Sequence, residues 1–151
     1  MTNSDYILTK AKDKDIAELI NFLISMHEES TTLYPQYNKN LMVRFIKPII
    51  LDELCLVIKY NKKIIGAIGG QVRRWWFSEN QYLGDAFCYV SPKHRSFKNA
   101  SLLLKGFNNI AEKKLIPCMV GTLDGNDVDR KDQLYNKLNF RRIGSTFANG
   151  V

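Results

Sequence analysis

The sequence predicts a mixed α/β domain built in three layers, with helices on both faces of a central sheet. Segments with strand-like and helix-like patterns follow one another in the order β-α-α-β-β-β-α-β-α-β. The composition, 45% hydrophobic and 25% charged, is that of a folded protein rather than a disordered one. The 151 residues suffice for one core, and no repeat, low-complexity tract or linker divides them. We therefore expect a single domain over residues 1–151.

The N-terminal third is predicted to contain one strand and two helices. Tyr6–Thr9 has the pattern of a short strand. Asp13 can cap a helix whose apolar residues recur with a period near 3.6 and which ends near Glu29. A second helix is expected over Leu41–Lys47. Pro48 is expected to end it, because its ring cannot continue the hydrogen-bond ladder.

The middle of the chain is predicted to be β-structure. Cys55–Tyr60 and Lys63–Val72 are rich in Ile and Val, and Asn61-Lys62 between them suits a tight hairpin. Arg73–Gln81 is expected to reverse the chain again. Gln81–Val90 then returns as the next strand.

The C-terminal part is predicted to alternate helices and strands. A long amphipathic helix begins near Ser96 and runs to about Lys114. Pro117–Thr122 is expected to form a strand and Asp129–Leu138 a short helix. A last strand is expected over Phe140–Phe147.

The charge balance indicates an anionic partner. Lys and Arg number 22 and Asp and Glu 15, which gives a formal net charge of +7 spread along the chain. A basic protein of this size tends to bind nucleic acid, a membrane surface or a phosphorylated ligand. The three cysteines lie far apart, which disfavours both a disulfide framework and a zinc site. With no apolar run long enough to span a membrane and no secretory signal, we expect a cytoplasmic protein that binds no membrane.

Several common kinds of catalytic site are excluded by the motifs. The sequence has no Walker loop, no Gly-x-Gly-x-x-Gly after a strand, no His-Glu-x-x-His and no Gly-x-Ser-x-Gly. His27 and His94 are the only histidines, which is too few for a histidine-rich metal centre. We therefore expect no bound metal.

A basic segment lies where the predicted strand Gln81–Val90 leads into the long helix. Lys93, Arg95 and Lys98 stand just before or within the first turn of that helix. A helix N-terminus carries unpaired amides and a partial positive charge, so this segment suits a pyrophosphate group. An ordinary basic turn exposed to solvent is the alternative.

The same segment resembles the GCN5-related N-acetyltransferase (GNAT) superfamily. In that family a strand ending Val-x-Pro leads into an Arg/Gln-x-x-Gly-x-Gly/Ala loop and a helix. Arg95-Ser96-Phe97-Lys98-Asn99-Ala100 matches at its first and last positions and has Lys98 where the family has Gly. Tyr135-Asn136-Lys137-Leu138-Asn139-Phe140 is similar to the family's C-terminal tyrosine and Gly-Phe, with Asn139 in place of Gly. Two further segments, Asp85–Pro92 and Met26–Ser30, are similar to a subset of the family common in bacteriophage genomes.

The resemblance implies a GNAT-like fold, with a mostly antiparallel sheet splayed around acetyl-coenzyme A. It also implies transfer of the acetyl group directly to a primary amine. The resemblance places the pantetheine arm on backbone groups of Phe87, Cys88, Tyr89 and Val90. It places the pyrophosphate on the amides of Arg95, Ser96, Phe97, Lys98, Asn99 and Ala100.

The resemblance also suggests the catalytic residues. Tyr135 matches the family position that protonates the leaving thiolate, although a tyrosine here could simply pack under the sheet. Asp85 is the candidate base, because its strand leads toward the thioester; a structural acceptor in the strand is the alternative. Glu28 and Glu29 at the end of the first helix are the second choices for the base and are also candidates to contact the acceptor; solvent-exposed carboxylates are the alternative.

The hairpin segment Arg73–Phe77 interleaves arginine with aromatic residues. Such a segment can stack on bases and neutralise phosphates, line the acceptor groove through Trp75, form a dimer contact, or pack on its own domain. Two alternatives to the enzyme are therefore a small nucleic-acid-binding module that uses this hairpin and a catalytically inactive GNAT-fold interaction protein. In the enzyme interpretation the partner is an amine, small or macromolecular, and nucleic acid enters only as an acceptor.

Overall fold

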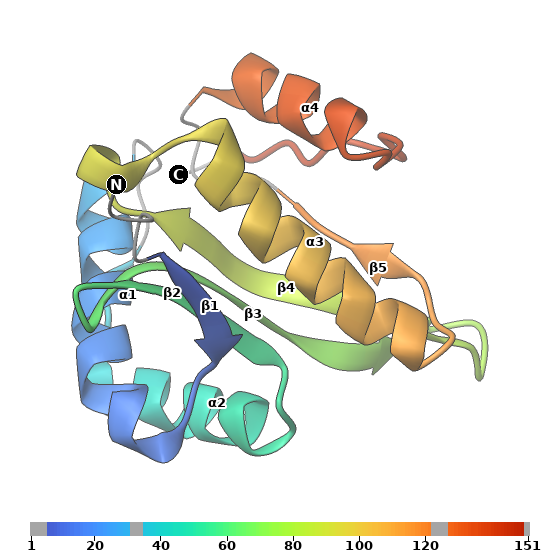
Figure 1. Ribbon diagram of the computed structural model, residues 1–151. Helices are drawn as coiled ribbons and strands as arrows, with labels where there is room; N and C mark the ends of the chain where they lie inside the picture. The colour runs from blue at the N-terminus through green and yellow to red at the C-terminus, as the bar shows by residue number, and fades with distance from the viewer. Residues whose placement is uncertain (1–5, 31–34, 122–126, 150–151) are drawn as a thin grey trace.

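A five-stranded sheet forms the centre of the computed structural model, which describes residues 6–30, 35–121 and 127–149 (Figure 1). The strands lie in chain order and are β1 (Ile7–Lys10), β2 (Cys55–Tyr60), β3 (Lys63–Arg74), β4 (Gln81–Val90) and β5 (Cys118–Met119). Neighbouring strands from β1 to β4 are antiparallel, and β5 is parallel to β4. The sheet is therefore mixed and mostly antiparallel, as predicted.

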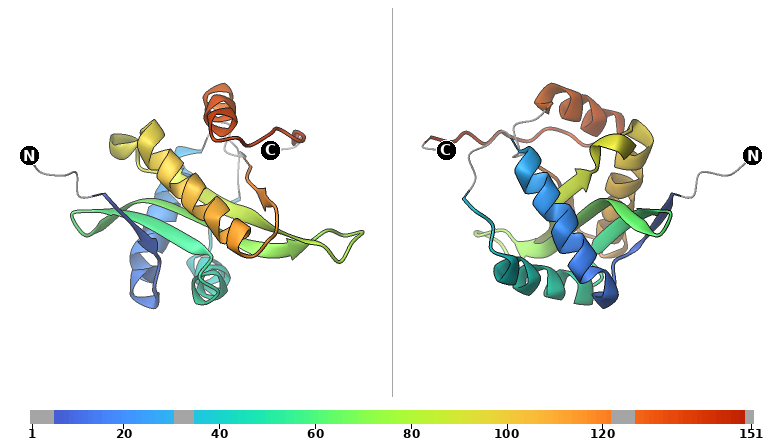
Figure 2. Two further views of the ribbon diagram at one scale, coloured as in Figure 1. Left: turned by 45° about the vertical axis from the view of Figure 1, so that its right-hand side comes forward. Right: turned by 90° about the vertical axis from the view of Figure 1, so that its left-hand side faces the viewer.

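Helices cover both faces of this sheet and complete the predicted three layers. Two helices lie on one face, α1 (Ile16–Glu29) and α2 (Lys39–Leu51), and α3 (Phe97–Lys113) lies on the other (Figure 2). The last helix, α4 (Val128–Lys137), lies on the same side as α3, above the N-terminal part of that helix (Figure 2). Within the described ranges, no helix is long and apolar enough to cross a membrane.

The core follows from the apolar spacing along the helices. Leu103, Leu104 and Phe107 recur on one side of α3 and are almost completely buried against the sheet. On the opposite face α1 contributes Leu19 and Leu23, which are also buried. These contacts fix the long helix, and with it the basic segment at its start, against the strands.

A β-bulge in β4 changes the direction of that strand. Gly69 pairs with Phe87 and Gly70 with Asp85, so Ala86 is an extra residue without a partner in β3. A Cβ atom at Gly69 would lie 2.5 Å from the Phe87 ring, so only glycine admits the ring there. The bulge re-aims the side chains on either side of it.

Beyond this bulge, β4 separates from β5. The parallel pairing covers only Leu83 with Cys118 and Gly84 with Met119. From Asp85 to Val90 the outer edge of β4 has no strand partner among the described residues. This is the splay that the family resemblance implies.

One turn and one helix show how local sequence affects the boundaries of the elements. Asn61 and Lys62 have φ of 48° and 66°, which confirms the tight hairpin between β2 and β3. The predicted end of the second helix at Pro48 is wrong: α2 begins after its cap Asn38 and continues to Leu51. Pro48 lies on the exposed side of the last turns, where water can bind the carbonyl it leaves unpaired.

The C-terminal region contains less strand than predicted. In place of Pro117–Thr122, β5 has only two residues, and Thr122 lies outside the described residues. The predicted strand Phe140–Phe147 is wrong, since this segment has no strand assignment. Phe140 is half-buried, but Ile143 and Phe147 further along are exposed, at 67% and 91%. No described strand lies beside the segment to pair with its backbone.

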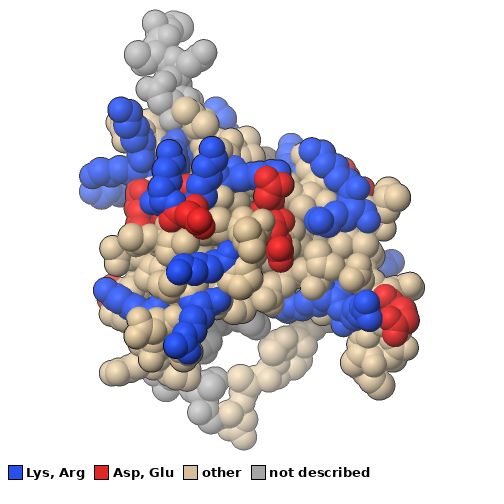
Figure 3. Space-filling view, turned by 90° about the horizontal axis from the view of Figure 1, so that it is seen from below, with Lys and Arg blue, Asp and Glu red and all other residues tan. Residues whose placement is uncertain are grey.

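Positive charge is spread over the face of the molecule that is seen from below (Figure 3). The face seen from below carries Lys and Arg side chains across its whole width rather than in one patch (Figure 3). This agrees with cations that are scattered along the sequence.

Candidate active site

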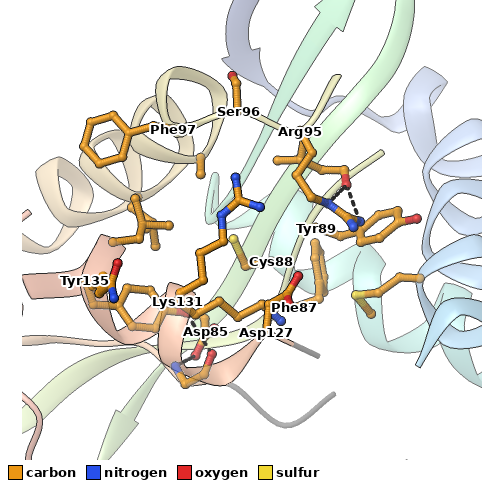
Figure 4. A pocket seen from close by; sticks show the side chains of 18 of the residues that line it. Asp85, Phe87, Cys88, Tyr89, Arg95, Ser96, Phe97, Asp127, Lys131 and Tyr135 are labelled. Carbon is orange, nitrogen blue, oxygen red and sulfur yellow. Dashed lines mark hydrogen bonds between the residues drawn. The ribbon is translucent and has the colours of Figure 1, made fainter. Parts of the chain in front are cut away.

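A cavity of about 670 Å³ opens where β4 separates from β5 (Figure 4). Its walls come from β4, the start of α3, α4 and the C-terminal end of α1. This volume suits a cofactor-sized ligand. The lining residues are Met26, His27, Ser30, Asp85, Ala86, Phe87, Cys88, Tyr89, Val90, Arg95, Ser96, Phe97, Ala100, Leu104, Gly121, Asp127, Arg130, Lys131, Gln133, Leu134, Tyr135 and Lys137.

The β4 wall contains the strand residues that the sequence singles out. Phe87, Cys88, Tyr89 and Val90 all line the cavity. The Val90 carbonyl already accepts two hydrogen bonds from Arg95, at 3.2 Å from Nε and 2.9 Å from Nη2. The Val90 carbonyl is therefore already engaged within the protein.

The start of α3 forms a second wall. The Ser96 hydroxyl accepts a hydrogen bond from the Asn99 amide at 3.1 Å and so caps the helix. Ser96, Phe97 and Ala100 line the cavity, but Lys98 and Asn99 do not. Lys98 is exposed, whereas Asn99 is buried and donates its side-chain amide to the His94 carbonyl at 2.8 Å. The amides of Phe97 and Lys98 precede the first intrahelical hydrogen bond, which is the position where a helix binds anions.

Arg95 lines the cavity and also forms hydrogen bonds to both the end of α1 and the end of β4. Its guanidinium holds both carboxylate oxygens of Glu29, at 2.7 and 3.1 Å. The Tyr89 hydroxyl donates to the same carboxylate at 2.6 Å. The hydrogen bond from Arg95 is the main reason why the pKa of Glu29 is lowered, and burial is the main reason why the pKa of Tyr89 is raised to about 12.

The two acceptor-side carboxylates predicted from the sequence are therefore not brought into the cavity wall. Glu29 is engaged by Arg95 and Tyr89, and Glu28 is on α1 outside the lining; neither lines the cavity. Glu28 directly follows His27, which does line the cavity. Adjacent side chains on a helix point about 100° apart, so the two residues face different directions.

Asp85 and Tyr135, the two predicted catalytic residues, meet at Gly121. Asp85 Oδ1 accepts a hydrogen bond from the Gly121 amide at 3.0 Å, and the Tyr135 hydroxyl donates to the Gly121 carbonyl at 3.1 Å. Burial raises the pKa of Asp85 to about 6, against the opposing effects of the Gly121 amide and the Arg73 charge. A carboxyl group with this pKa is mostly ionised at pH 7 and is more basic than an ordinary aspartate.

Tyr135 combines a packed ring with a polar tip. Its ring contacts Phe140 edge to face, with 6.2 Å between centroids, while the residue lines the cavity (Figure 4). Asn139, directly before Phe140, has a φ of 65°, the left-handed conformation that the Gly-like position requires. Packing and a role in the cavity are therefore compatible for this side chain.

The fourth wall, α4, brings cations that the sequence analysis did not select. Arg130, Lys131 and Lys137 line the cavity, and the Lys137 ammonium lies 5.5 Å from the centre of the Phe97 ring. Arg130, Leu134 and Lys137 follow helical spacing within the predicted helix. That spacing was the signal that could have identified them.

Trp75 is not among the residues that line the cavity. It lies at the β3–β4 hairpin, where its ring contacts Tyr82 with 4.8 Å between centroids. The strands β3 and β4 continue well past the sheet's covered part, which places their connecting turn away from the splay (Figure 1).

Comparison with solved structures identifies the fold. A predicted acetyltransferase with acetyl-CoA from Clostridium acetobutylicum superposes with a TM-score of 0.73 at 16% identity, over 96% of each chain. An acetyltransferase of the GNAT family from Streptococcus pneumoniae gives 0.71 at 20% identity, over 92% of this chain and 86% of that one. An acetyltransferase from Trypanosoma brucei gives 0.71 at 14% identity, over 97% and 100%.

No protein-family model and no curated protein sequence matches the chain. The three-dimensional similarity nevertheless extends over almost its whole length. The protein has the fold of the GCN5-related N-acetyltransferases.

Proposed function

We propose that this protein is an N-acetyltransferase that moves the acetyl group of acetyl-coenzyme A directly to a primary amine. The observation that carries the proposal is the meeting of Asp85 and Tyr135 at Gly121, inside the cavity opened by the splay of β4 and β5. The cavity thus has a base, a proton donor and an open strand edge close together. The shared fold with acetyltransferases, one of them solved with acetyl-CoA, supports the same conclusion.

The residues present suit coenzyme A. The edge of β4 beyond Gly84 pairs with no strand among the described residues and lines the cavity, which suits the amide-containing pantetheine arm. The first-turn amides of α3 suit the pyrophosphate, and Arg130, Lys131 and Lys137 add positive charge around it. When bound, acetyl-coenzyme A supplies an activated acetyl thioester. The formal charge of +7 then has an anionic partner without a need for nucleic acid.

Asp85 is proposed as the base. An alkyl amine has a pKa of about 10.4 and is mostly protonated at neutral pH, so a proton must leave before the nitrogen can attack. The burial that raises the pKa of Asp85 to about 6 makes its carboxylate a better acceptor for that proton. The proton passes to Asp85 directly or through a water molecule.

Tyr135 is proposed as the acid. The leaving sulfur needs a proton, because a thiol has a pKa of about 8.5 and a thiolate is a poor product to release in a buried site. The Tyr135 hydroxyl can donate that proton instead of donating to the Gly121 carbonyl.

The test combines binding and turnover. Calorimetry with acetyl-coenzyme A should show one site per chain, and a panel of primary amines should include acceptors that release free thiol and gain an acetyl mass. Asp85→Asn and Tyr135→Phe should bind the cofactor but turn over slowly. Binding without turnover over a broad panel, small amines and aminoacylated RNA included, would favour the inactive interaction protein. No binding of acetyl-coenzyme A would reject the proposal.

A further inference from the structure

The β3–β4 hairpin carries a cluster of aromatic side chains that acetyl transfer does not use. The hairpin projects beyond the helices that cover the sheet (Figure 2). We call residues 73–80, which contain this cluster, the hairpin tip. Trp76 is 94% exposed and Phe77 is 67% exposed, and their rings contact each other edge to face with centroids 5.4 Å apart. Two large apolar rings are thus open to solvent at one projecting point.

Aromatic contacts and an ion pair stabilise the conformation of the hairpin tip. Trp75 is half-buried and contacts both Tyr82, at 4.8 Å, and Phe77, at 5.8 Å between centroids. The Arg74 guanidinium pairs with Glu79 across the turn at 2.8 Å. The turn that carries the exposed rings is therefore already ordered by these contacts. Binding of a ligand to the rings costs the protein little conformational entropy for this reason.

Two cationic residues lie near this end of the sheet. Arg73 is exposed and forms no ion pair in the part of the chain that the structure describes. Lys114 lies near the same end of the sheet, because it shares a cavity wall with Gln71 and Val72. The one acidic residue of the turn, Glu79, is neutralised by Arg74.

The chemistry of the hairpin tip favours one kind of partner. Two rings are too small a surface for a stable protein interface, which needs about 800 Å² on each partner. Insertion into a bilayer would carry the exposed Glu79 carboxylate, together with Ser78 and Asn80, toward the lipid. Base stacking needs only one aromatic face for each base, and nearby arginine contacts the phosphates.

We propose that the hairpin tip binds single-stranded nucleic acid, with bases stacked on Trp76 and Phe77 and the phosphate backbone beside Arg73. Trp76 and Phe77 do not line the acetyl-coenzyme A cavity, whereas the Arg73 charge also acts on Asp85 in its wall. Binding of nucleic acid here can be tested whether or not the protein transfers acetyl groups.

The chain offers a direct reporter for this site. It contains two tryptophans, Trp75 and Trp76, and both lie in the hairpin tip. A single-stranded RNA of about twelve uridines, within the usual site size for such proteins, should quench the intrinsic tryptophan fluorescence. Heparin should quench it far less, because it carries charge but no bases. Acetyl-coenzyme A affinity and the far-UV circular dichroism spectrum serve as checks that each variant is folded.

The variants separate stacking from charge. Trp76→Ala should weaken RNA binding by about 5- to 100-fold and Phe77→Ala by a similar factor, with Trp75 left as the reporter. Trp76→Phe keeps a ring and should retain most of the affinity. Phe147→Ala, a matched exposed aromatic residue elsewhere on the chain, should change nothing.

Three results would overturn the proposal. Equal affinity for heparin and RNA, unchanged by Trp76→Ala, would show charge attraction only. Quenching by phosphatidylglycerol vesicles and not by RNA would show a lipid contact. A dimer in sedimentation that Trp76→Ala converts to a monomer, with no RNA binding, would show a contact between copies of the chain.

Discussion

Replacement of Asp85 by asparagine should make the protein more stable and, at the same time, inactive. The carboxyl group is partly buried at the cavity wall, and its pKa is raised from 3.8 to about 6, mainly by this burial. Folding therefore opposes the ionisation that the unfolded chain allows. The carboxylate destabilises the folded state at every pH at which the unfolded chain is ionised.

The size of this effect depends on pH. A rise of roughly two pKa units corresponds to about 3 kcal/mol at pH 8, about half of that at pH 5, and little at pH 4. The asparagine side chain keeps a carbonyl oxygen to accept the Gly121 amide, so Asp85→Asn removes the charge but not the hydrogen bond. We expect a gain of about 1–3 kcal/mol at pH 8, because relaxation of the site reduces the full value.

Urea unfolding of both proteins at pH 8 and pH 5 measures the difference. The gain in unfolding free energy should be larger at pH 8 than at pH 5, while kcat falls by about 10²–10⁴-fold. Asp129→Asn, on the exposed start of α4, is the matched control: it should leave kcat unchanged and lower the unfolding free energy by at most about 1 kcal/mol, because a carboxylate in the first turn stabilises a helix. An Asp85→Asn protein that is less stable than the wild type at pH 8, or that keeps full turnover, would refute the assignment of a buried base.

Three further predictions concern residues in or next to the cavity. Tyr135→Phe should lower kcat by about 10²–10⁴-fold and change the Kd for acetyl-coenzyme A little; wild-type turnover would show that another group supplies the proton. A double-mutant cycle with Arg95→Ala and Glu29→Gln should give a coupling of about 1 kcal/mol in unfolding. Because the pKa of Glu29 is lowered from 4.5, this coupling should be fully present at pH 7 and lost as the pH falls through the lowered pKa, and equal coupling at pH 2 and pH 7 would contradict it. Lys98→Gly should change the cofactor Kd less than about threefold and cost about 0.5–1 kcal/mol of stability, since Lys98 is exposed in the first helical turn; a tenfold change of Kd in either direction would show that its side chain acts at the phosphates.

Local patterns predicted those elements that local interactions decide. The β2–β3 turn at Asn61-Lys62 and the long helix α3 follow from residue type and apolar spacing. The predicted strand Phe140–Phe147 failed because apolar residues form a strand only beside a partner, and the two-residue β5 does not extend to meet it. Strand formation there depended on a long-range pairing that one sequence does not reveal.

In the candidate site, too, features that depend on local sequence were predicted and those that depend on distant contacts were not. The strand Asp85–Val90 and the helix start at Ser96 were found from contiguous motifs, and both line the cavity. The pairing of Arg95 with Glu29, 66 residues away in sequence, could not be predicted, and neither could the β-bulge at Ala86. Both depend on how distant segments pack. The sequence therefore indicated which residues belong to the site but not which residues they contact.

A crystal structure of the protein grown with acetyl-coenzyme A tests the central claim most directly. The proposal predicts electron density for the pantetheine arm along the open edge of β4 and for the pyrophosphate at the first turn of α3. The thioester should then lie between Asp85 and Tyr135. Cofactor density outside this cavity, or a cofactor bound within it whose thioester contacts neither Asp85 nor Tyr135, would contradict the account.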